Sequence, residues 1–274
     1  MEHVKKITVH SQQMSIYFDQ MNRGVELSAT PKRIISIVPS QTELLFDLGL
    51  DEEIIGITKF CIHPTDKVKR RLKVGGTKKL NINQIKKLNP DLIIGNKEEN
   101  EKDQIEELMQ YFPVWMSDIS NLDDAVDMIR KVGQMVDREE KAGQMASTIT
   151  ASFDNLKIKS SLLKVAYLIW RKPYIVAGKG TFIDDMLIRC GLKNAFEQER
   201  YPEAFPGQVV DANPDLVFLS SEPYPFTDRH ITEFQALVPN AKIQLVDGEL
   251  FSWYGSRLLQ APEYFKQLIA SLNR

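Results

Sequence analysis

Hydrophobic and polar positions alternate at the start of the chain and then group into short apolar runs separated by helical segments. Alternation over 14–27 around Asn22-Arg23-Gly24 predicts a β-hairpin closed by a glycine-containing turn. The apolar run 34–38 is followed by helical spacing over 42–48, which predicts a strand-turn-helix unit. Further apolar runs lie at 54–57, 92–95 and 114–116, with helical stretches at 82–88 and 103–111. Such alternation predicts a parallel sheet covered by helices.

The same pattern restarts after residue 160. Apolar runs lie at 165–170, 174–177, 216–219 and 243–246, and a helix is predicted over 181–190. The motif Asn89-Pro90-Asp91-Leu92 recurs as Asn213-Pro214-Asp215-Leu216. In both copies proline ends a helix and apolar residues then enter a strand, so the motif indicates a helix-to-strand boundary and not a catalytic site. We therefore predict that the chain is built from two similar halves.

The segment between the halves has the spacing of a helix, because apolar residues recur three and four positions apart over 123–158. As one unbroken helix it would extend about 50 Å, at ~1.5 Å per residue. Asp137 and Glu140 have the pattern of a new helix cap, which marks the position where a kink is expected. We predict an α/β fold with two lobes, each with a central, mostly parallel sheet flanked by helices. The predicted units are an N-terminal lobe with its opening hairpin over 1–120, a connecting spine helix over 121–160 and a C-terminal lobe over 161–274.

Composition and charge narrow the function classes. A hydrophobic content of 43% and a charged content of 26% are those of a globular chain with a sizeable core. With 35 Lys plus Arg against 37 Asp plus Glu, the net charge is −2, which provides no global field for nucleic acid, and we expect no nucleic-acid partner. No apolar stretch has the length of a membrane span or of a signal-peptide core. The chain as written is expected to be cytoplasmic if Met1 is the native start, whereas a chain whose signal or lipid anchor had been removed would have the same pattern.

Polar residues follow the first strand of the predicted parallel sheet. Ser40, Gln41 and Thr42 lie where this strand turns into a helix. Their hydroxyl and amide groups could offer donors to an anionic or amide-bearing ligand. An ordinary N-cap for the helix is the equal alternative.

A cysteine and a histidine follow the next short strand. Cys61 and His63 offer a thiolate and an imidazole, which are strong ligands for a metal or for the cobalt of a corrin. The same pair could supply the nucleophile and base of an enzyme, but no third orienting group is evident. One pair is also only half of a metal site, so a buried cysteine beside a histidine and a proline turn is the alternative. We predict that the protein is not an enzyme.

Aromatic residues leave two strands of the second half. Trp170, Arg171 and Tyr174 follow its first strand, which predicts that they face the space between the lobes. The rings would stack on a flat ligand, and Arg171 would pair with a carboxylate or phosphate. Core packing is the alternative for Trp170. Tyr224 lies in a proline-rich loop at another strand end, which either lines a site or caps the sheet.

The strongest candidate group for ligand contact lies just before the last helix. Trp253, Tyr254 and Arg257 combine two aromatic rings with one cation in a short segment. Binding sites commonly join aromatic walls to a few polar anchors. For Arg257 a structural role, such as anchoring Glu249 or a carbonyl group, is the alternative.

Several motifs occur in a characteristic order along the chain. They are Asp19-Gln20-Met21, Pro31-Lys32-Arg33-Ile34-Ile35-Ser36, Pro39-Ser40-Gln41-Thr42-Glu43-Leu44, Gly75-Gly76-Thr77, both Asn-Pro-Asp-Leu copies and 178–185. Together they resemble the helical-backbone metal-receptor family, the substrate-binding proteins of ABC importers for cobalamin, ferric siderophores and haem. The similarity runs from about residue 18 to about residue 268 and is closest to the cobalamin branch.

This resemblance implies a rigid, two-lobed, monomeric protein that is periplasmic, or membrane-anchored outside the cytoplasm. Its ligand would lie in a shallow cleft between the lobes and pass to an ABC permease in the membrane. No reaction and no resident cofactor are implied, and the expected ligand is cobalamin or another metal-chelate complex. In the cobalamin branch aromatic side chains from both lobes hold the corrin ring, a role that falls here to Phe60, Tyr174, Trp253 and Tyr254.

The sequence departs from the cobalamin branch at several expected positions. An aromatic residue expected after Val74 is replaced by Gly75-Gly76-Thr77, which leaves Thr77 as the candidate contact. Another aromatic position is represented by Tyr201 or Glu203. The stretches 81–85 and 205–209 lack the acidic residues that meet permease arginines in that branch.

The leading hypothesis is a corrinoid-binding protein of an ABC import system. A ferric-siderophore or haem-binding protein is the near alternative, and a cytoplasmic corrinoid or metal carrier is another. Only Arg171, Arg200 and Arg257 are obvious cations for an anionic complex, which favours a neutral or weakly charged macrocycle.

Overall fold

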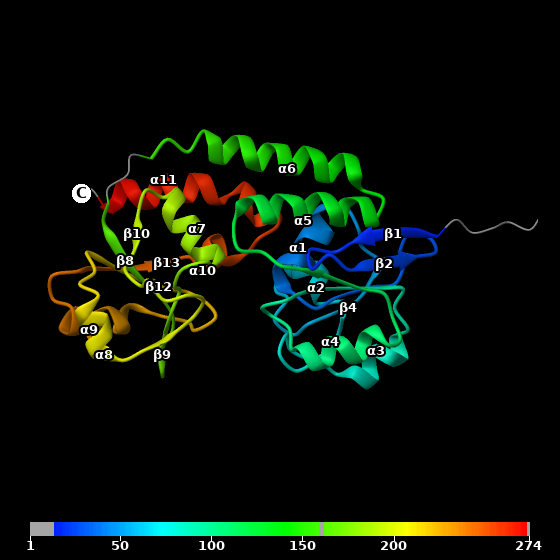
Figure 1. The fold of residues 1–274 in the computed structure, drawn as a ribbon, viewed down its shortest axis with the longest axis horizontal. Helices are drawn as coiled ribbons and strands as arrows, with labels where there is room; N and C mark the ends of the chain where they lie inside the picture. The colour runs from blue at the N-terminus through cyan, green and yellow to red at the C-terminus, as the bar shows by residue number, and fades with distance from the viewer. Residues whose placement is uncertain (1–13, 159–161, 273–274) are drawn as a thin grey trace, which may run out of the picture.

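The computed structural model describes residues 14–158 and 162–272, which form two lobes side by side, each around its own sheet (Figure 1). The N-terminal lobe has the parallel strand order β5-β4-β3-β6-β7. Its strands are β3 (Ile34–Ser36), β4 (Ile54–Ile57), β5 (Leu72–Lys73), β6 (Leu92–Asn96) and β7 (Val114–Ser117). Its helices are α1 (Pro39–Asp47), α2 (Thr65–Val68), α3 (Ile82–Leu88) and α4 (Lys102–Met109). The expected opening hairpin is present as β1 (Ser15–Phe18) and β2 (Gly24–Leu27).

The C-terminal lobe has the strand order β11-β9-β8-β12-β13, with β10 also paired to β8. Its strands are β8 (Lys164–Trp170), β9 (Tyr174–Val176), β10 (Lys193–Asn194), β11 (Glu203–Ala204), β12 (Leu216–Ser220) and β13 (Lys242–Val246). Its helices are α7 (Phe182–Arg189), α8 (Pro206–Asp211), α9 (Asp228–Leu237), α10 (Gly248–Ser252), the 3-10 helix η1 (Ser256–Leu259) and α11 (Ala261–Leu272). Strands β8, β10, β12 and β13 are parallel, whereas β9 runs antiparallel to β8 and β11. The sheet is therefore mixed at one edge.

The two Asn-Pro-Asp-Leu motifs have the same local structure in both lobes. Asn89 and Asn213 both adopt the left-handed backbone conformation, with φ of 44°, one and two residues after the ends of α3 and α8. Asp91 and Asp215 each accept a backbone N–H from the start of a neighbouring strand, at 2.9 and 2.8 Å. The motif thus ends a helix and ties the next strand to its neighbour, as a helix-to-strand boundary requires.

The expected continuous spine helix is replaced by two helices, α5 (Leu122–Met135) and α6 (Glu139–Asp154), which pack against each other. The chain reverses at Asp137, whose φ of 56° lies in the left-handed region and cannot continue a helix. Gly133 permits the close approach, because a Cβ there would lie 2.2 Å from the Cβ of Ala142. Helix α6, about 24 Å long at ~1.5 Å per residue, lies along the top of the molecule in Figure 1, above α5. Periodicity alone could not distinguish one helix from two that share a packing stripe.

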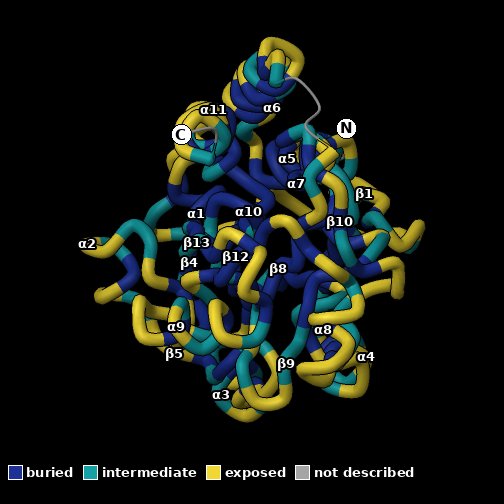
Figure 2. Tube along the Cα trace, turned by 90° about the vertical axis from the view of Figure 1, so that its left-hand side faces the viewer, coloured by how far each residue is buried: buried dark blue, intermediate teal, exposed yellow. Residues whose placement is uncertain are grey.

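The segment between α10 and α11 returns to the N-terminal lobe. Helix η1 packs on α1, and a Cβ on Gly255 would lie 3.0 Å from the Ser40 carbonyl oxygen. One buried cluster includes both Leu44 of α1 and Phe265 of α11. Figure 2 shows buried trace concentrated around β8, β12 and α10, with exposed trace in the outer loops. The lobes therefore share part of their core, which opposes large hinge motion.

None of the helices within the described ranges has the length and apolar content of a membrane span.

Candidate functional site

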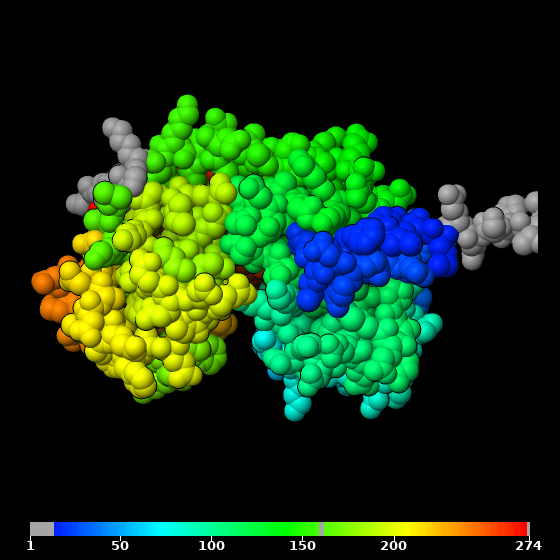
Figure 3. Space-filling model, viewed as in Figure 1, coloured from blue at the N-terminus to red at the C-terminus, as the bar shows by residue number. Residues whose placement is uncertain are grey.

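A cavity of about 1410 Å³ lies between the two lobes. Figure 3 shows the corresponding hollow between the yellow C-terminal lobe and the green and cyan N-terminal lobe. Its walls are formed largely by segments that follow β3, β4, β5, β6 and β12, at the carboxyl ends of parallel strands. Open α/β sheets bind ligands at this edge. The lining includes Ser40, Phe60, Thr77, Glu98, Glu99, Tyr201, Glu222, Trp253 and Tyr254.

Phe60 is the most exposed aromatic side chain of the cavity wall. Its ring is 50% exposed, and the Lys59 ammonium group lies 5.0 Å from the ring centroid. Gly76 makes room for this ring, because a Cβ there would lie 3.0 Å from Phe60 Cε2. The glycine segment that replaces the expected aromatic residue therefore leaves space for Phe60 on the same wall.

Trp253 and Glu222 form the facing wall. Glu222 Oε1 accepts hydrogen bonds from Trp253 Nε1 at 2.9 Å and from Ser252 Oγ at 2.6 Å. His63 packs edge-on against the Trp253 ring, with centroids 5.5 Å apart. Burial raises the pKa of Glu222 above its usual range. The indole is thus held in one orientation by contacts with both lobes.

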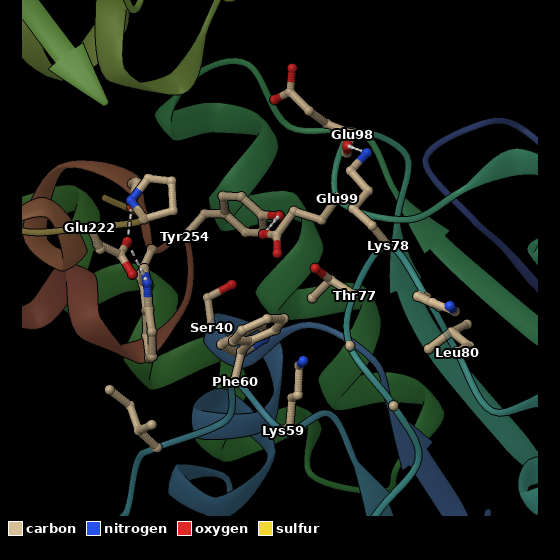
Figure 4. A pocket seen from close by; sticks show the side chains of 18 of the residues that line it. Ser40, Lys59, Phe60, Thr77, Lys78, Leu80, Glu98, Glu99, Glu222 and Tyr254 are labelled. Atoms are coloured by element: carbon tan, nitrogen blue, oxygen red, sulfur yellow. Dashed lines mark hydrogen bonds between the residues drawn. The ribbon is translucent and has the colours of Figure 1, made fainter. Parts of the chain in front are cut away.

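Tyr254 and Glu99 meet across the cavity. The Tyr254 hydroxyl donates to Glu99 Oε1 at 2.8 Å (Figure 4). Burial, together with the nearby carboxylates Glu222 and Glu98, raises the pKa of Glu99 to about 7. Glu98 receives a hydrogen bond from Arg200 at 2.5 Å, while burial raises its pKa. The cavity lining therefore includes three partly buried carboxyl groups, those of Glu98, Glu99 and Glu222, whose pKa values burial raises.

Ser40 stands in the first turn of α1 and is only 3% exposed. Its Oγ has no hydrogen-bond partner within the described residues. No side chain caps the N-terminus of α1. Figure 4 shows the Ser40 hydroxyl directed into the cavity, towards the region of Glu99 and Tyr254. The site thus has a donor group without a partner opposite carboxyl groups.

The structure brings half of the predicted ligand contacts together at this cavity. Those that line it are Ser40, Phe60, Thr77, Tyr201, Trp253 and Tyr254. Those outside its lining are Gln41, Trp170, Arg171, Tyr174, Tyr224 and Arg257. Gln41 is buried and donates to Ser117 Oγ at 2.6 Å, because its side chain on α1 faces the neighbouring sheet.

Four of the predicted residues that do not line the cavity contact other residues of the C-terminal lobe. Arg171 and the Tyr174 hydroxyl both donate to Glu233, at 2.7 and 2.8 Å. The Trp170 ring packs edge-on against Tyr224, with centroids 5.7 Å apart. Trp170, Arg171 and Tyr174 lie at the antiparallel β8–β9 pair, and these contacts hold them on the C-terminal lobe instead of in the expected cleft position. Tyr224, in the loop after β12, packs on the same lobe and takes the alternative role of covering the sheet.

Arg257 links the lobes beside the cavity. Its guanidinium group donates to Glu43 of α1 at 2.6 and 3.0 Å and contacts Glu249 at 3.1 Å. It also lies 5.2 Å from the Trp253 ring centroid. The arginine therefore supports the wall from behind, in the structural role that was the alternative to ligand contact.

Cys61 and His63 have separate partners. Cys61 is 2% exposed, with its Sγ 3.1 and 3.2 Å from the hydroxyls of Thr42 and Thr58, and burial raises the pKa of its thiol. His63 Nε2 lies 3.1 Å from Glu249. In the described ranges no group of three or more His, Cys, Asp and Glu side chains could hold a metal ion. The structure thus gives the pair the packing role that was its alternative.

Sequence reasoning missed the carboxyl groups of the site. Glu98 and Glu99 follow β6, and Glu222 follows β12 in the same proline-rich loop as the candidate residue Tyr224. Their position after the carboxyl ends of predicted parallel strands was the available signal.

Residues 34–239 match the periplasmic binding protein family, and the chain belongs to this family. A vitamin B12-binding protein of Pectobacterium carotovorum is 24% identical over 254 residues, which cover 89% of this chain and 91% of that protein. A Bacillus subtilis protein described as an uncharacterized ABC transporter substrate-binding lipoprotein is 26% identical over 211 residues, 73% of this chain and 67% of its own. The crystal structure of the periplasmic vitamin B12-binding protein BtuF of Vibrio cholerae has a TM-score of 0.76 at 21% identity, covering 89% of this chain and 99% of that one. The family and the two-lobed α/β fold class predicted from the sequence are confirmed.

Proposed function

We propose that this protein binds a corrinoid of the cobalamin class between its lobes, as the substrate-binding component of an ABC import system. The observation that carries the proposal is the cavity of about 1410 Å³ with aromatic walls. Pockets for drug-sized ligands typically measure about 300–1,000 Å³. A cavity above that range suits a large macrocycle better than a small metabolite.

The aromatic side chains suit a flat, largely apolar ring. Phe60 presents an exposed face from the N-terminal lobe, while Trp253 and Tyr254 belong to the opposite wall. A macrocycle between them would release water from both of its faces and stack on the rings. The vitamin B12-binding relatives support a corrinoid as this macrocycle.

The charges near the cavity oppose strongly anionic ligands. Among the described residues that line it, four are acidic and three are cationic: Glu98, Glu99, Glu107 and Glu222 against Lys59, Lys78 and Lys79. Lys78 already contacts Glu101 at 3.3 Å. Like charges that meet across an interface weaken binding. A corrinoid with neutral side chains therefore fits better than haem or a ferric siderophore, which were the alternatives.

The proposed transport role implies a cellular location and a partner for the protein. Family membership and the lipoprotein relative support a location outside the cytoplasm and delivery to an ABC permease. Binding and delivery need no bond-making step and no resident cofactor. A single chain already forms both walls of the cavity, which supports a monomer.

The direct test is titration of the protein with cyanocobalamin, followed by tryptophan fluorescence and by calorimetry. We expect saturable one-to-one binding. Phe60→Ala removes an exposed ring from the cavity wall and should weaken binding about tenfold. The matched control is Phe18→Ala, because Phe18 is 62% exposed on the opening hairpin and lies outside the cavity lining.

A calorimetric titration without heat of binding for both cyanocobalamin and dicyanocobinamide would exclude the corrinoid class. Haemin and a ferric hydroxamate siderophore would then be titrated against the same protein. Equal weakening by Phe60→Ala and Phe18→Ala would show that the corrinoid binds elsewhere.

A further inference from the structure

The cavity contains a hydrogen-bond donor whose partner is absent from the described residues. Ser40 is 3% exposed, and its Oγ makes no hydrogen bond with the described residues although it lines the cavity. A buried hydroxyl that makes no hydrogen bond is destabilising, because it has lost its contacts with water and gained none in return. The adjacent backbone N–H groups at the start of α1 also lack an acceptor within the helix. An acceptor atom on the bound ligand would satisfy this group.

Glu99 offers the complementary acceptor. Its Oε1 receives the Tyr254 hydroxyl at 2.8 Å, whereas its Oε2 receives no hydrogen bond from the described residues. Figure 4 shows Ser40, in the first turn of α1, and Glu99, in the loop after β6, directed into the same region of the cavity. The Ser40 hydroxyl as donor and the Glu99 carboxyl group as acceptor would together suit a ligand group that has both an acceptor atom and an N–H or O–H donor.

We propose that Ser40 and Glu99 together recognise one primary carboxamide group of the bound ligand, an inference that rests on the function proposed above. The Ser40 hydroxyl donates to the amide oxygen, and the Glu99 carboxyl group accepts an N–H of the amide nitrogen. A carboxamide thus satisfies both groups at once. The pair makes the cavity selective for ligands with amide side chains.

A carboxylate in the same place would satisfy only Ser40. It has no N–H for Glu99 and would meet the negative charge of Glu98, Glu99 and Glu222. Sites built to hydrogen-bond one polar group reject analogues that leave their buried groups without partners. The geometry therefore favours the amide and rejects the acid of the same shape.

Two corrinoids separate these cases. Dicyanocobinamide carries carboxamide side chains on the corrin ring, and dicyanocobyrinic acid carries carboxylic acids at these positions. We expect calorimetry at pH 8 to give at least about tenfold tighter binding of dicyanocobinamide. Ser40→Ala should weaken dicyanocobinamide about fivefold to tenfold. Glu99→Gln, which adds N–H donors and removes the charge, should improve binding of the acid and narrow the difference between the two ligands.

The matched control is Ser256→Ala. Ser256 is 4% exposed and its hydroxyl also has no partner within the described residues, but it does not line the cavity. It should leave both affinities unchanged, and thermal melting of each variant checks that it is folded. Equal affinity for the two corrinoids, or an unchanged ratio in both Ser40→Ala and Glu99→Gln, would overturn this inference alone. Binding of neither corrinoid would overturn the function proposed above and this inference with it.

Discussion

The hydroxyl of Tyr254 donates a hydrogen bond of 2.8 Å to Glu99 Oε1. These residues are 155 positions apart, yet their contact joins the loop after β6 to the segment after α10. The phenol is buried, and both groups line the cavity. A change in the protonation of Glu99 therefore acts directly on a contact that holds the cavity wall together.

This coupling predicts a specific pH dependence of stability. Burial raises the pKa of Glu99 to about 7, from an ordinary value of 4.5. Between these pH values the folded state keeps a proton that the unfolded chain has lost, so the free energy of unfolding falls as the pH rises. Glu99 alone contributes about 3 kcal/mol to this fall. Urea unfolding at pH 5, 6, 7 and 8 should show it, and Glu99→Gln should reduce it.

Glu52→Gln is the control for this series. The Glu52 side chain is 93% exposed, so its replacement should leave the pH profile as it is in the wild type. A profile of Glu99→Gln that parallels the wild type would contradict the prediction.

The Arg257 ion pairs are predicted to stabilise the joint between the lobes. Arg257 is largely buried and contacts Glu43 and Glu249, so Arg257→Ala would leave the buried Glu43 carboxylate without its ion-pair partner. We expect a loss of about 3–5 kcal/mol in the free energy of unfolding. Arg171→Ala breaks the more exposed pair with Glu233 and should cost at most about 1 kcal/mol. Similar losses in the two variants would count against a supporting role for Arg257.

Two glycines test the contact between α5 and α6. Gly133→Ala places a methyl group against Ala142 and should cost about 1–3 kcal/mol despite the better helix propensity of alanine. Gly143 lies on α6 with nothing within 4 Å of an added Cβ. Gly143→Ala should therefore stabilise the protein by about 0.5–1 kcal/mol. Chemical denaturation measures both changes, and a stabilising Gly133→Ala would disprove the close approach of the helices.

The two serines without hydrogen-bond partners in the described ranges provide a stability test that needs no ligand. Ser40→Ala and Ser256→Ala remove buried hydroxyls that make no hydrogen bond there. Because no native bond is lost, the free energy of unfolding should stay the same or rise by about 1 kcal/mol in each. A clear loss in thermal melting experiments on Ser40→Ala would mean that its hydroxyl has a partner in the ligand-free protein.

The sequence by itself determined the elements and their class. Apolar runs such as 34–38 and 216–219 predicted strands buried on both faces, and the repeated Asn-Pro-Asp-Leu motif marked two corresponding helix-to-strand boundaries. It also placed Ser40 at a strand-to-helix junction and Phe60 just after a strand, where parallel sheets bind ligands. These features depend on local periodicity and on backbone preferences, which a single sequence records directly.

Only the tertiary structure decided how these elements meet. The reversal at Asp137 turned one expected spine into two packed helices, and the β8–β9 turn kept Tyr174 away from the cavity. The contact of Glu99 with Tyr254 likewise forms because the segment after α10 returns to the N-terminal lobe. Hydrophobic periodicity states which face of an element is buried, but it does not name the partner that covers that face. Contacts between distant segments are fixed by the packing of the whole chain, and in this protein those contacts form the site.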